Sequence, residues 1–107
     1  MPVVYAIRCT NGYHYVGCTA GSLTKRMREH RSLLNAGNHS SRKLQKDWER
    51  FGDAAFECIA LEACSATASV MDKRIREMFW MQKFSSLGKL YNQYQTSFQP
   101  KRSSAMR

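Results

Sequence analysis

Residues 3–18 read VVYAIRCTNGYHYVGC, and this stretch decides the fold. Two runs rich in β-branched and aromatic residues, Val3 to Cys9 and Tyr13 to Cys18, lie on either side of Asn11-Gly12. Such runs favour strands, and Asn-Gly is the strongest short-range signal for a tight turn between two strands. The chain is therefore predicted to begin with a β-hairpin.

The register of this hairpin has two alternatives. A two-residue turn at Asn-Gly would pair Arg8 with Tyr15 and put Tyr5 and Tyr15 on opposite faces of the hairpin. A three-residue loop that begins at Thr10, with the glycine left-handed in a bulge, would pair Ile7 with Tyr15. That second register puts both tyrosines on one face, because Tyr5 lies two residues from Ile7.

Two helices are expected after the hairpin. Ser22 is a suitable N-cap for a helix that runs to about Asn35, and Gly37 is a suitable stop. The buried stripe of this helix repeats at helical spacing and consists of Leu23, Met27, His30 and Leu34. Ser40 or Ser41 caps a second helix that ends at Phe51-Gly52-Asp53, with Leu44 and Trp48 facing inward.

The remaining elements complete one small domain. Residues 56–61 (FECIAL) predict a third strand, Ser65 opens a long helix to about Phe84, and residues 90–92 form a short ordered segment. The predicted order is β-β-α-α-β-α, an α/β fold with a three-stranded sheet flanked by helices. We expect residues 1–95 to form the domain and residues 96–107 to be a basic, mobile tail.

The composition indicates a polyanionic partner. The chain has 107 residues, enough for one domain, with 17 Lys and Arg against 8 Asp and Glu, for a net charge of +9. Neutralising phosphates releases condensed counterions, so this excess favours nucleic acid and predicts binding that weakens steeply with salt. We find no long apolar run, signal peptide or Cys-x-x-Cys pair, which favours a reducing cytoplasm over a membrane or a zinc site.

One carboxylate falls in an unexpected position. Around the long helix, apolar residues cluster on two roughly opposite sides, and Glu77 lies within one of these stripes. A helix that is apolar on two sides is expected to be largely enclosed, so Glu77 is expected to be substantially buried. A buried carboxylate must be paired, protonated or bound to a metal. A structural ion pair with Arg74 or Lys73 is the alternative to a metal or catalytic role.

Positive groups on the first predicted helix match this acid. Arg26 and His30 are four residues apart, so they share one flank of the helix and could approach an anion together. On their own, such residues more often form a solvated helix edge. A nuclease needs a cation for the phosphate, a base for water and a carboxylate for a metal. No second acid falls beside Glu77, so one metal ion is favoured over a two-metal cluster.

Taken together, these residues resemble the GIY-YIG nuclease family, and most closely the catalytic domains of phage intron homing endonucleases. The resemblance covers residues 3–92 and rests on motifs that are weak singly and specific in this order. They are Val3-Val4-Tyr5, Tyr15-Val16-Gly17, Arg26-x-x-x-His30, His39-Ser40-Ser41, Lys43-Leu44-Gln45, Glu77-x-Phe79-Trp80 and Tyr91-Asn92. Val3 stands where the family motif has glycine; we expect it to be tolerated, because the chemistry needs Tyr5 and a strand backbone.

The resemblance implies a role for each residue at the site. Tyr5 would be the general base or would position the attacking water, and Tyr15 would hold phosphate or water beside it. Arg26 would stabilise charge on the phosphoryl oxygens, and His30 would hydrogen-bond Tyr5 or relay its proton. His39 would help to hold phosphate near the second helix.

The resemblance also implies the metal and the fold. Glu77 would be the one protein ligand of a single Mg²⁺ or Mn²⁺ ion, which otherwise keeps its waters. Asn92 would orient neighbouring groups or a phosphate. Both tyrosines are required at one site, so the GIY-YIG fold favours the three-residue loop of the hairpin.

The implied function is a metal-dependent DNA endonuclease that hydrolyses phosphodiester bonds, by nicking or by double-strand cleavage. The alternative is a non-catalytic nucleic-acid-binding module on the same fold. We expect a double-stranded DNA partner, either sequential nicks or a transient homodimer on DNA, no membrane, and the cytoplasm of a bacterial or phage-infected cell. The DNA backbone would be followed by basic residues of the first two helices, namely Lys25, Arg28, Arg31, Arg42, Lys43 and Lys46.

Overall fold

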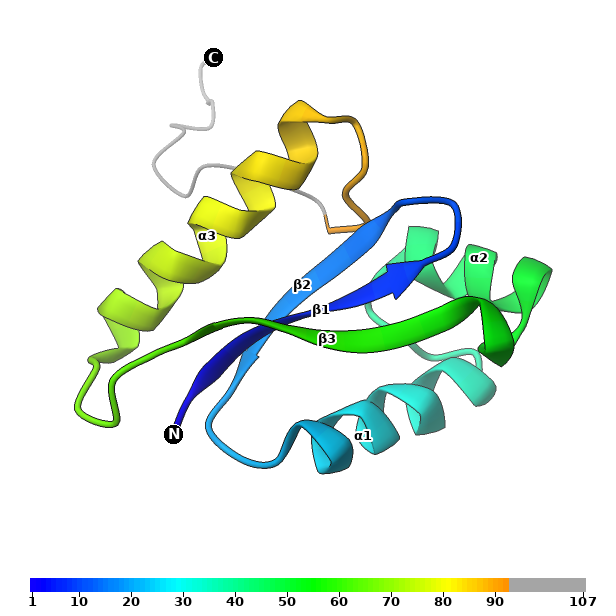
Figure 1. The fold of residues 1–107 in the computed structure, drawn as a ribbon. Coiled ribbons are helices and arrows are strands. Elements are labelled where there is room, and N and C mark those ends of the chain that lie inside the picture. The colour runs from blue at the N-terminus through cyan, green and yellow to red at the C-terminus, as the bar shows by residue number, and fades with distance from the viewer. Residues whose placement is uncertain (93–107) are drawn as a thin grey trace, which may run out of the picture.

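A computed structural model of the chain describes residues 1–92. Its elements follow in the order β1 (Val3–Cys9), β2 (His14–Thr19), α1 (Leu23–Asn35), α2 (Arg42–Phe51), a short 3-10 turn η1 (Asp53–Ala55), β3 (Phe56–Ala63) and α3 (Val70–Ser86) (Figure 1). The predicted β-β-α-α-β-α order and three-stranded sheet are confirmed. The boundary predicted between residues 95 and 96, and the basic tail after it, lie outside the described residues.

The hairpin adopts the three-residue loop. Ile7 pairs with Tyr15 and Arg8 with His14 across the antiparallel strands β1 and β2. Gly12 has a φ of 92°, in the left-handed region that glycine tolerates, and its N–H donates to the carbonyl of Cys9. This register places Tyr5 and Tyr15 on the same face of the sheet.

Helices α1 and α2 cover that face. The sheet order is β2-β1-β3, so β1 is the central strand and β2 is an edge. Odd-numbered residues of β1 point toward α1 and α2, where they form the larger core. The buried members of this core are Tyr5, Ile7, Cys9, Met27, Leu34, Leu44, Trp48, Phe56 and Tyr91.

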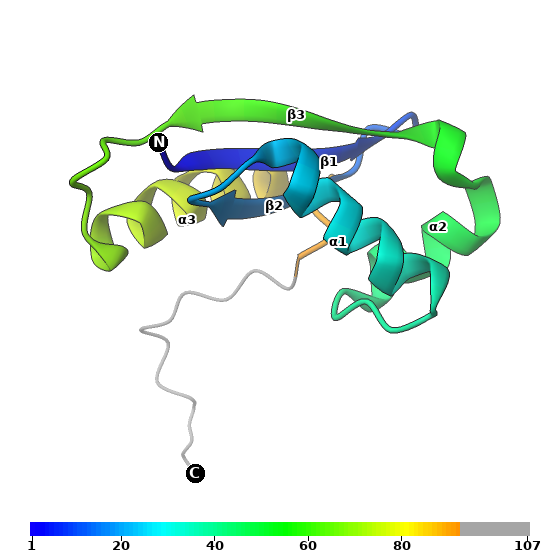
Figure 2. The ribbon, with the colours of Figure 1, turned by 90° about the horizontal axis from the view of Figure 1, so that it is seen from below.

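Helix α3 covers the opposite face of the sheet. Val4 and Val16 point to this side and pack with Trp80, Met81 and Phe84 of α3 in a second, smaller core. Viewed from below, the sheet separates α1 from α3 (Figure 2). The molecule is therefore a three-layer sandwich in which side chains of one hairpin enter two different cores.

The first two helices begin and end where the sequence predicts. The hydroxyl of Ser22 accepts from the N–H of Lys25 at the start of α1, and Ser41, rather than Ser40, caps α2 by accepting from Leu44. Such side-chain caps satisfy N–H groups that have no partner within the helix. The helix boundaries here follow from local sequence alone.

The start of α3 differs from the prediction. The helix begins at Val70 and not at Ser65, because Ser69 and Asp72 form a reciprocal capping box. The hydroxyl of Ser65 instead accepts from the N–H of Thr67 within a preceding turn. A serine that stabilises a turn competes with one that caps a helix, and the later serine has the acid at the third position that completes the box.

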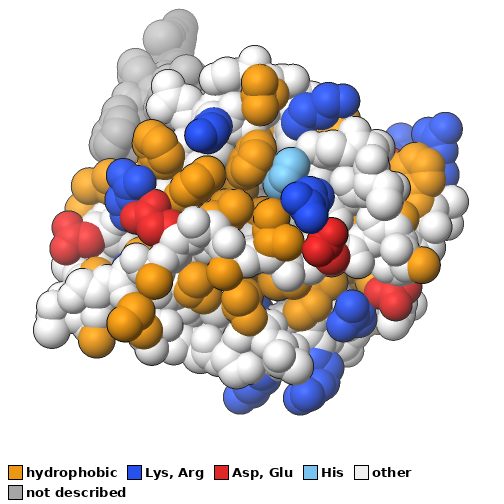
Figure 3. Space-filling model, in the orientation of Figure 1, with side chains coloured by type: hydrophobic (Ala, Val, Ile, Leu, Met, Phe, Trp, Pro, Cys, Tyr) orange, Lys and Arg blue, Asp and Glu red, His pale blue; other side chains and the backbone are white. Residues whose placement is uncertain are grey.

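The expectation that α3 is enclosed is wrong. Val70, Met71, Ile75 and Phe79 are exposed, so the outer side of α3 is an apolar stripe open to solvent. Hydrophobic side chains are visible on the side of the molecule where α3 lies (Figure 3). Only one side of the helix packs on the sheet, because no further element of the described chain covers the other. Glu77, which was expected to be substantially buried, is consequently half-buried.

The segment after α3 returns to the edge strand β2. The N–H of His14 donates to the carbonyl of Lys89, and the N–H of Tyr91 donates to the carbonyl of His14. The ring of His14 stacks on the ring of Phe84, with 3.9 Å between the ring centroids. None of the helices within residues 1–92 is long and apolar enough to span a membrane.

Candidate active site

The hydroxyl of Tyr5 lies directly over the main chain of β2. Tyr5 and Gly17 are cross-strand partners, and a Cβ atom built on Gly17 would be 2.4 Å from the Tyr5 hydroxyl oxygen. No side chain larger than hydrogen fits at position 17 while the ring keeps this place. Gly17 therefore lets the phenol of Tyr5 reach across β2 toward the edge of the sheet.

Two nitrogen atoms of α1 converge on this hydroxyl. Nε2 of His30 is 2.6 Å from the Tyr5 oxygen, and Nε of Arg26 donates to the same oxygen at 3.2 Å. Arg26 also pairs through another guanidinium nitrogen with Glu29, and its side chain remains 37% exposed. Arg26 thus contacts Tyr5 on one side and presents part of its charge to solvent. The two residues predicted to act together on α1 do meet at Tyr5.

A second histidine, His39, contacts the ring of His30. Nδ1 of His30 is 2.8 Å from Nε2 of His39, and Nδ1 of His39 accepts from the main-chain N–H of Ser41 at 3.0 Å. The main-chain N–H of His39 donates to the Gln45 side chain, which in turn donates to the carbonyl of Leu34. His39 is buried and both of its ring nitrogens have protein partners, and its role in holding phosphate stays a prediction.

Tyr15 packs beside both imidazoles. Its ring meets His30 at 5.4 Å and His39 at 5.1 Å between centroids, edge to face in each case. Burial raises the pKa of the Tyr15 phenol, Ser40 and Arg26 lower it, and the charge of Glu77 raises it further. Tyr15 therefore lies within electrostatic reach of Arg26 on one face of the sheet and Glu77 on the other.

Burial controls protonation throughout this cluster. It raises the pKa of Tyr5 to about 12, although the nearby Arg26 acts in the opposite direction. It also lowers the pKa of His30 to about 4, helped by the charges of Arg26 and His39, and lowers the pKa of His39. Both imidazoles are consequently neutral at pH 7, and the phenol of Tyr5 is protonated when only these groups surround it.

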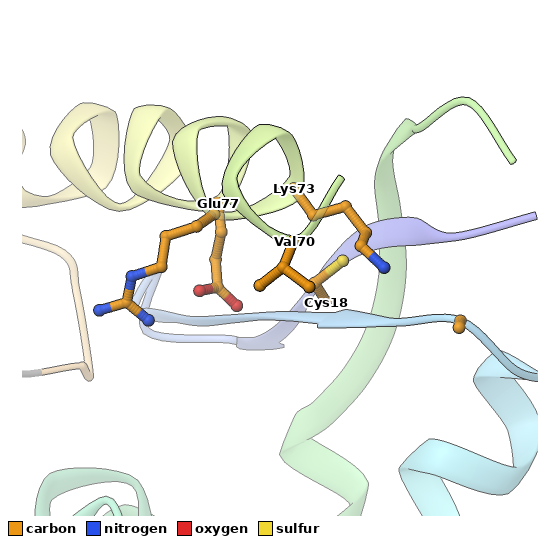
Figure 4. Close-up of a pocket in the computed structure, with 6 residues that line it drawn as sticks. Cys18, Val70, Lys73 and Glu77 are labelled. Carbon is orange, nitrogen blue, oxygen red and sulfur yellow. The ribbon is translucent and has the colours of Figure 1, made fainter. Parts of the chain in front are cut away.

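Glu77 approaches the same strand from the other layer. Its carboxylate points from α3 toward β2, in a cavity of about 240 Å³ that Cys18 and Ala20 of the β2 region line with Val70, Lys73 and Arg74 (Figure 4). The amine of Lys73 points away from it in this view. Burial raises the pKa of Glu77, against the charge of Arg74, and within residues 1–92 the carboxylate has no hydrogen bond or ion pair. The alternative considered from sequence, a structural ion pair with Arg74 or Lys73, is thus not formed within the described part of the chain.

Glu77 and the cavity beside it fit a hydrated divalent ion. Residues 1–92 contain no cluster of three or more His, Cys, Asp or Glu side chains able to hold a metal. Mg²⁺ commonly uses one or two carboxylates and keeps several waters. A water takes about 30 Å³ of liquid volume, so the cavity beside Glu77 has room for such a shell. One unpaired carboxylate facing this space is compatible with a hydrated ion.

Asn92 secures the strand between the two layers. Its side-chain oxygen accepts from the N–H of Val16 at 2.8 Å, and its amide donates to the carbonyl of Val16 at 3.0 Å. Val16 lies between Tyr15 and Gly17, the residues that face α1 and α2. Asn92 therefore holds the segment after α3 against the edge strand of the site, and its role in orienting neighbouring groups or a phosphate stays a prediction.

Comparison with known proteins agrees with this geometry. The sequence profile of the GIY-YIG catalytic domain matches residues 1–92. The chain belongs to the GIY-YIG family. It is 36% identical over 90 residues to Intron-associated endonuclease 1 of Enterobacteria phage T4. This match covers 83% of our chain and 35% of that protein, so the chain spans about a third of its curated relative.

Solved structures of the same family have this fold. The catalytic domain of homing endonuclease I-TevI superimposes with a TM-score of 0.78 and 31% identity, over 89% of our chain and 100% of that one. A mutant of the I-TevI catalytic domain gives a TM-score of 0.76 and 32% identity, over 90% and 98%. The family profile, which matches residues 1–92, spans every candidate site residue of this GIY-YIG chain.

The basic residues predicted to follow DNA are all exposed on α1 and α2. Arg31 differs from the others because it is paired with Asp53. Arg42 and Lys43 line a cavity of about 380 Å³ together with Ser40, Ser41 and Asn92. That cavity adjoins the site, since Ser41 bonds His39 and Asn92 bonds Val16.

Three residues of this GIY-YIG domain were given no individual role from sequence. Gly17 was part of a motif, but its position inside a predicted strand was a signal that another group approaches the backbone there. Ser41 was considered only as a helix cap, and nothing local indicated that its N–H also serves His39. Gln45 was likewise part of a motif, and its contact with His39 depends on how α1 and α2 pack.

Proposed function

We propose that this chain is the catalytic part of a metal-dependent DNA endonuclease. One observation carries the proposal: Tyr5, Arg26 and His30 meet on one face of β2, while an unpaired Glu77 approaches the same strand from the other face. Tyr15 lies within electrostatic reach of both sets. A proton-transfer group, a cation and an unpaired acid around one strand edge are what phosphodiester hydrolysis needs.

In this reaction Tyr5 is the general base. Its phenolate takes a proton from water as the water oxygen bonds to phosphorus and the bond from phosphorus to the leaving oxygen breaks. A free phenol titrates near 10, and burial makes the pKa of Tyr5 higher still. The N–H donors of Arg26 and His30 stabilise the phenolate and offset part of this burial. The exposed part of the Arg26 guanidinium faces charge that develops on the phosphoryl oxygens.

Glu77 would hold a single metal ion, Mg²⁺ or Mn²⁺. When bound, the ion supplies Lewis-acid stabilisation of negative charge on the phosphate and the leaving oxygen. Glu77 is free for this role because its carboxylate forms no ion pair within the described chain, although Arg74 and Lys73 line the same cavity. Tyr15 packs beside the imidazoles, close enough for the charge of Glu77 to act on its phenol, and positions phosphate or water there.

Double-stranded DNA is the proposed substrate, and the basic face of α1 and α2 holds its backbone. Lys25, Arg28 and Lys46 are exposed and have no ion pair within the described chain, while Arg42 and Lys43 border the cavity next to the site. Such contacts position the duplex without reading its sequence. The similarity to intron-associated endonucleases supports a homing role in a bacterial or phage-infected cytoplasm, with two strands cut by sequential nicks or by a transient dimer.

Plasmid cleavage tests the proposal. Supercoiled DNA is incubated with the wild type, Glu77→Gln and Glu57→Gln in Mg²⁺, Mn²⁺ or EDTA. The two substitutions change net charge equally, and Glu57 lies on β3, paired with Arg8. We expect metal-dependent cutting by the wild type and Glu57→Gln, and a loss of about 100-fold or more in Glu77→Gln. DNA binding with no cutting by any protein in any metal would instead indicate a non-catalytic binding module.

A further inference from the structure

The contacts between Tyr5, His30 and His39 have a direction that one main-chain group determines. A neutral imidazole carries one N–H donor and one bare nitrogen acceptor, and its neighbours decide which nitrogen is which. A main-chain N–H can only donate. Ser41 donates such an N–H to Nδ1 of His39 at 3.0 Å. Nδ1 of His39 is therefore the bare nitrogen, and Nε2 carries the hydrogen.

The hydrogen position on His39 also determines the hydrogen position on the ring of His30. Nε2 of His39 lies 2.8 Å from Nδ1 of His30, so His39 donates and Nδ1 of His30 accepts. Nε2 of His30 then carries its hydrogen and donates to the Tyr5 oxygen, 2.6 Å away. The opposite direction would place an N–H of His39 against the N–H of Ser41, with no acceptor between two donors.

We propose that the main-chain N–H of Ser41 sets this direction, and that His39 is a positioning residue that keeps His30 a donor to Tyr5. The proposal rests on the nuclease function proposed above and changes what His30 can do within it. His30 cannot take the proton of Tyr5, because its remaining nitrogen already accepts from His39. Of the two roles that sequence left open for His30, hydrogen bonding is retained and proton relay is excluded.

The proton of Tyr5 must then leave by another route. The Tyr5 oxygen accepts from His30 and from Nε of Arg26, which leaves its own hydrogen directed away from both. Hydroxide or a buffer base that enters the site from solvent removes that proton, giving the phenolate and water or the protonated buffer. The phenolate keeps both N–H bonds and later takes one proton from the attacking water. The low pKa of His30, about 4, agrees with a ring that gains no proton during this cycle.

Nitrogen NMR measures the direction without any DNA. Protonated and bare imidazole nitrogens differ widely in ¹⁵N chemical shift, and long-range couplings to the ring protons assign them. In the ¹⁵N-histidine-labelled chain at pH 7.5, we expect both His30 and His39 to carry the hydrogen on Nε2. Ser41→Ala keeps the main-chain N–H and loses the capping hydroxyl, so the same two tautomers are expected in that variant.

Two substitutions of His39 test its positioning role. The amide of His39→Gln offers an acceptor and a donor in the same order as the imidazole, whereas His39→Leu fills the space and offers neither. We expect kcat for plasmid cleavage to fall about 100-fold in His39→Leu, with KM for DNA unchanged because His39 is buried. His39→Gln should recover at least 10-fold of that loss, and His30 should lose its single tautomer only in His39→Leu.

The two hypotheses fail separately. Hydrogen on Nδ1 of either ring in the wild type would overturn the proposed direction, whether or not the protein cuts DNA. Equal kcat in His39→Leu and His39→Gln would overturn the positioning role. The expected tautomers in a protein that cuts no DNA in any metal would support the direction and contradict the nuclease function.

Discussion

The two faces of the sheet carry opposite kinds of polar group. On the face under α1 and α2, Tyr5, His30 and His39 are buried, and each polar atom of the cluster has a partner within hydrogen-bond distance. On the face under α3, Glu77 is half-buried and has no partner among residues 1–92, and the outer side of the helix is exposed and apolar. The same edge strand, β2, borders both.

This difference separates two tasks of one active site. A group that handles protons must be held in one geometry, because small misplacements are costly to the rate. A group that binds a hydrated ion must keep its charge available and its surroundings open to water. The face under α1 and α2, with Tyr5, His30 and His39, suits the first task and is called the paired face below. The face under α3, with Glu77, suits the second task and is called the unpaired face.

The largest expected effect comes from adding a methyl group at Gly17, between the main chain of β2 and the hydroxyl of Tyr5. In Gly17→Ala the new Cβ would lie 2.4 Å from the Tyr5 hydroxyl, so the ring must move off β2 and away from His30. A shift of about 1 Å at a reacting group can cost 100-fold in rate. We expect plasmid nicking to fall by at least about 100-fold, with DNA binding retained in a gel-shift assay.

Gly21→Ala is the matched control. A Cβ at Gly21 meets only the Thr19 hydroxyl, at 4.0 Å, so cleavage should stay close to the wild type. Thermal unfolding of both variants separates a displaced ring from a lost fold. Wild-type cleavage by a folded Gly17→Ala protein would show that the position of the Tyr5 hydroxyl over β2 is unimportant.

A smaller effect is expected when the pH is lowered, because the histidines of the paired face then reduce the free energy of unfolding. The folded pKa of His30 is about 4, below its ordinary value near 6.5. Between these values the unfolded chain binds more protons than the folded chain, so the free energy of unfolding decreases as pH falls through this window. His39 has a lowered pKa and contributes in the same direction. We expect urea unfolding to show this decrease from pH 7 to pH 5.

The substitution His30→Gln removes one of the two titrations. The variant should be less stable than the wild type at pH 7 and should lose less stability between pH 7 and pH 5. An equal loss in the two proteins would mean that His30 is protonated as easily in the folded chain as in the unfolded one.

The smallest effect is expected on the outer side of α3. Ile75 is 54% exposed, so Ile75→Gln should change the free energy of unfolding by no more than about 0.5 kcal/mol. The paired face supplies the contrast: Leu34 is fully buried, and Leu34→Ala should cost about 2–5 kcal/mol. A large loss of stability in Ile75→Gln would indicate that this side is covered in solution.

Most of the paired face could be predicted from local sequence. The caps at Ser22 and Ser41 and the stripe of α1 gave helix boundaries that the structure confirms. The hairpin register needed more, since periodicity allowed two pairings. The three-residue loop was selected by the resemblance, which required Tyr5 and Tyr15 on one face, and not by the turn residues themselves.

The unpaired face, under α3, was predicted less well. Ser65 and Ser69 are both acceptable helix caps, and only the acid at the third position after Ser69 separates them. Two apolar stripes indicated that α3 is enclosed, but a sequence cannot say whether a second element is present to cover the outer stripe. Glu77 was found through that pattern, although its burial was overestimated.

The hydrogen-bond direction lay beyond sequence. The N–H of Ser41 and the side chain of Gln45 reach His39 only after α1 and α2 have packed. Every residue carries the same main-chain donor, so no residue type marks the one that matters. The motifs identified His39 as a site residue, but they did not indicate that both of its ring nitrogens have protein partners.

The side-chain amide of Asn92 also hinders the addition of a strand from another molecule to the sheet. An unpaired edge strand can accept a strand from another molecule, which is a common start of aggregation. Asn92 occupies both main-chain groups of Val16, and the segment at Leu90 pairs with His14, so neighbouring positions of β2 are already taken. A strand from another protein chain can therefore be added at β3, the opposite edge, more readily than beside Tyr15 and Gly17.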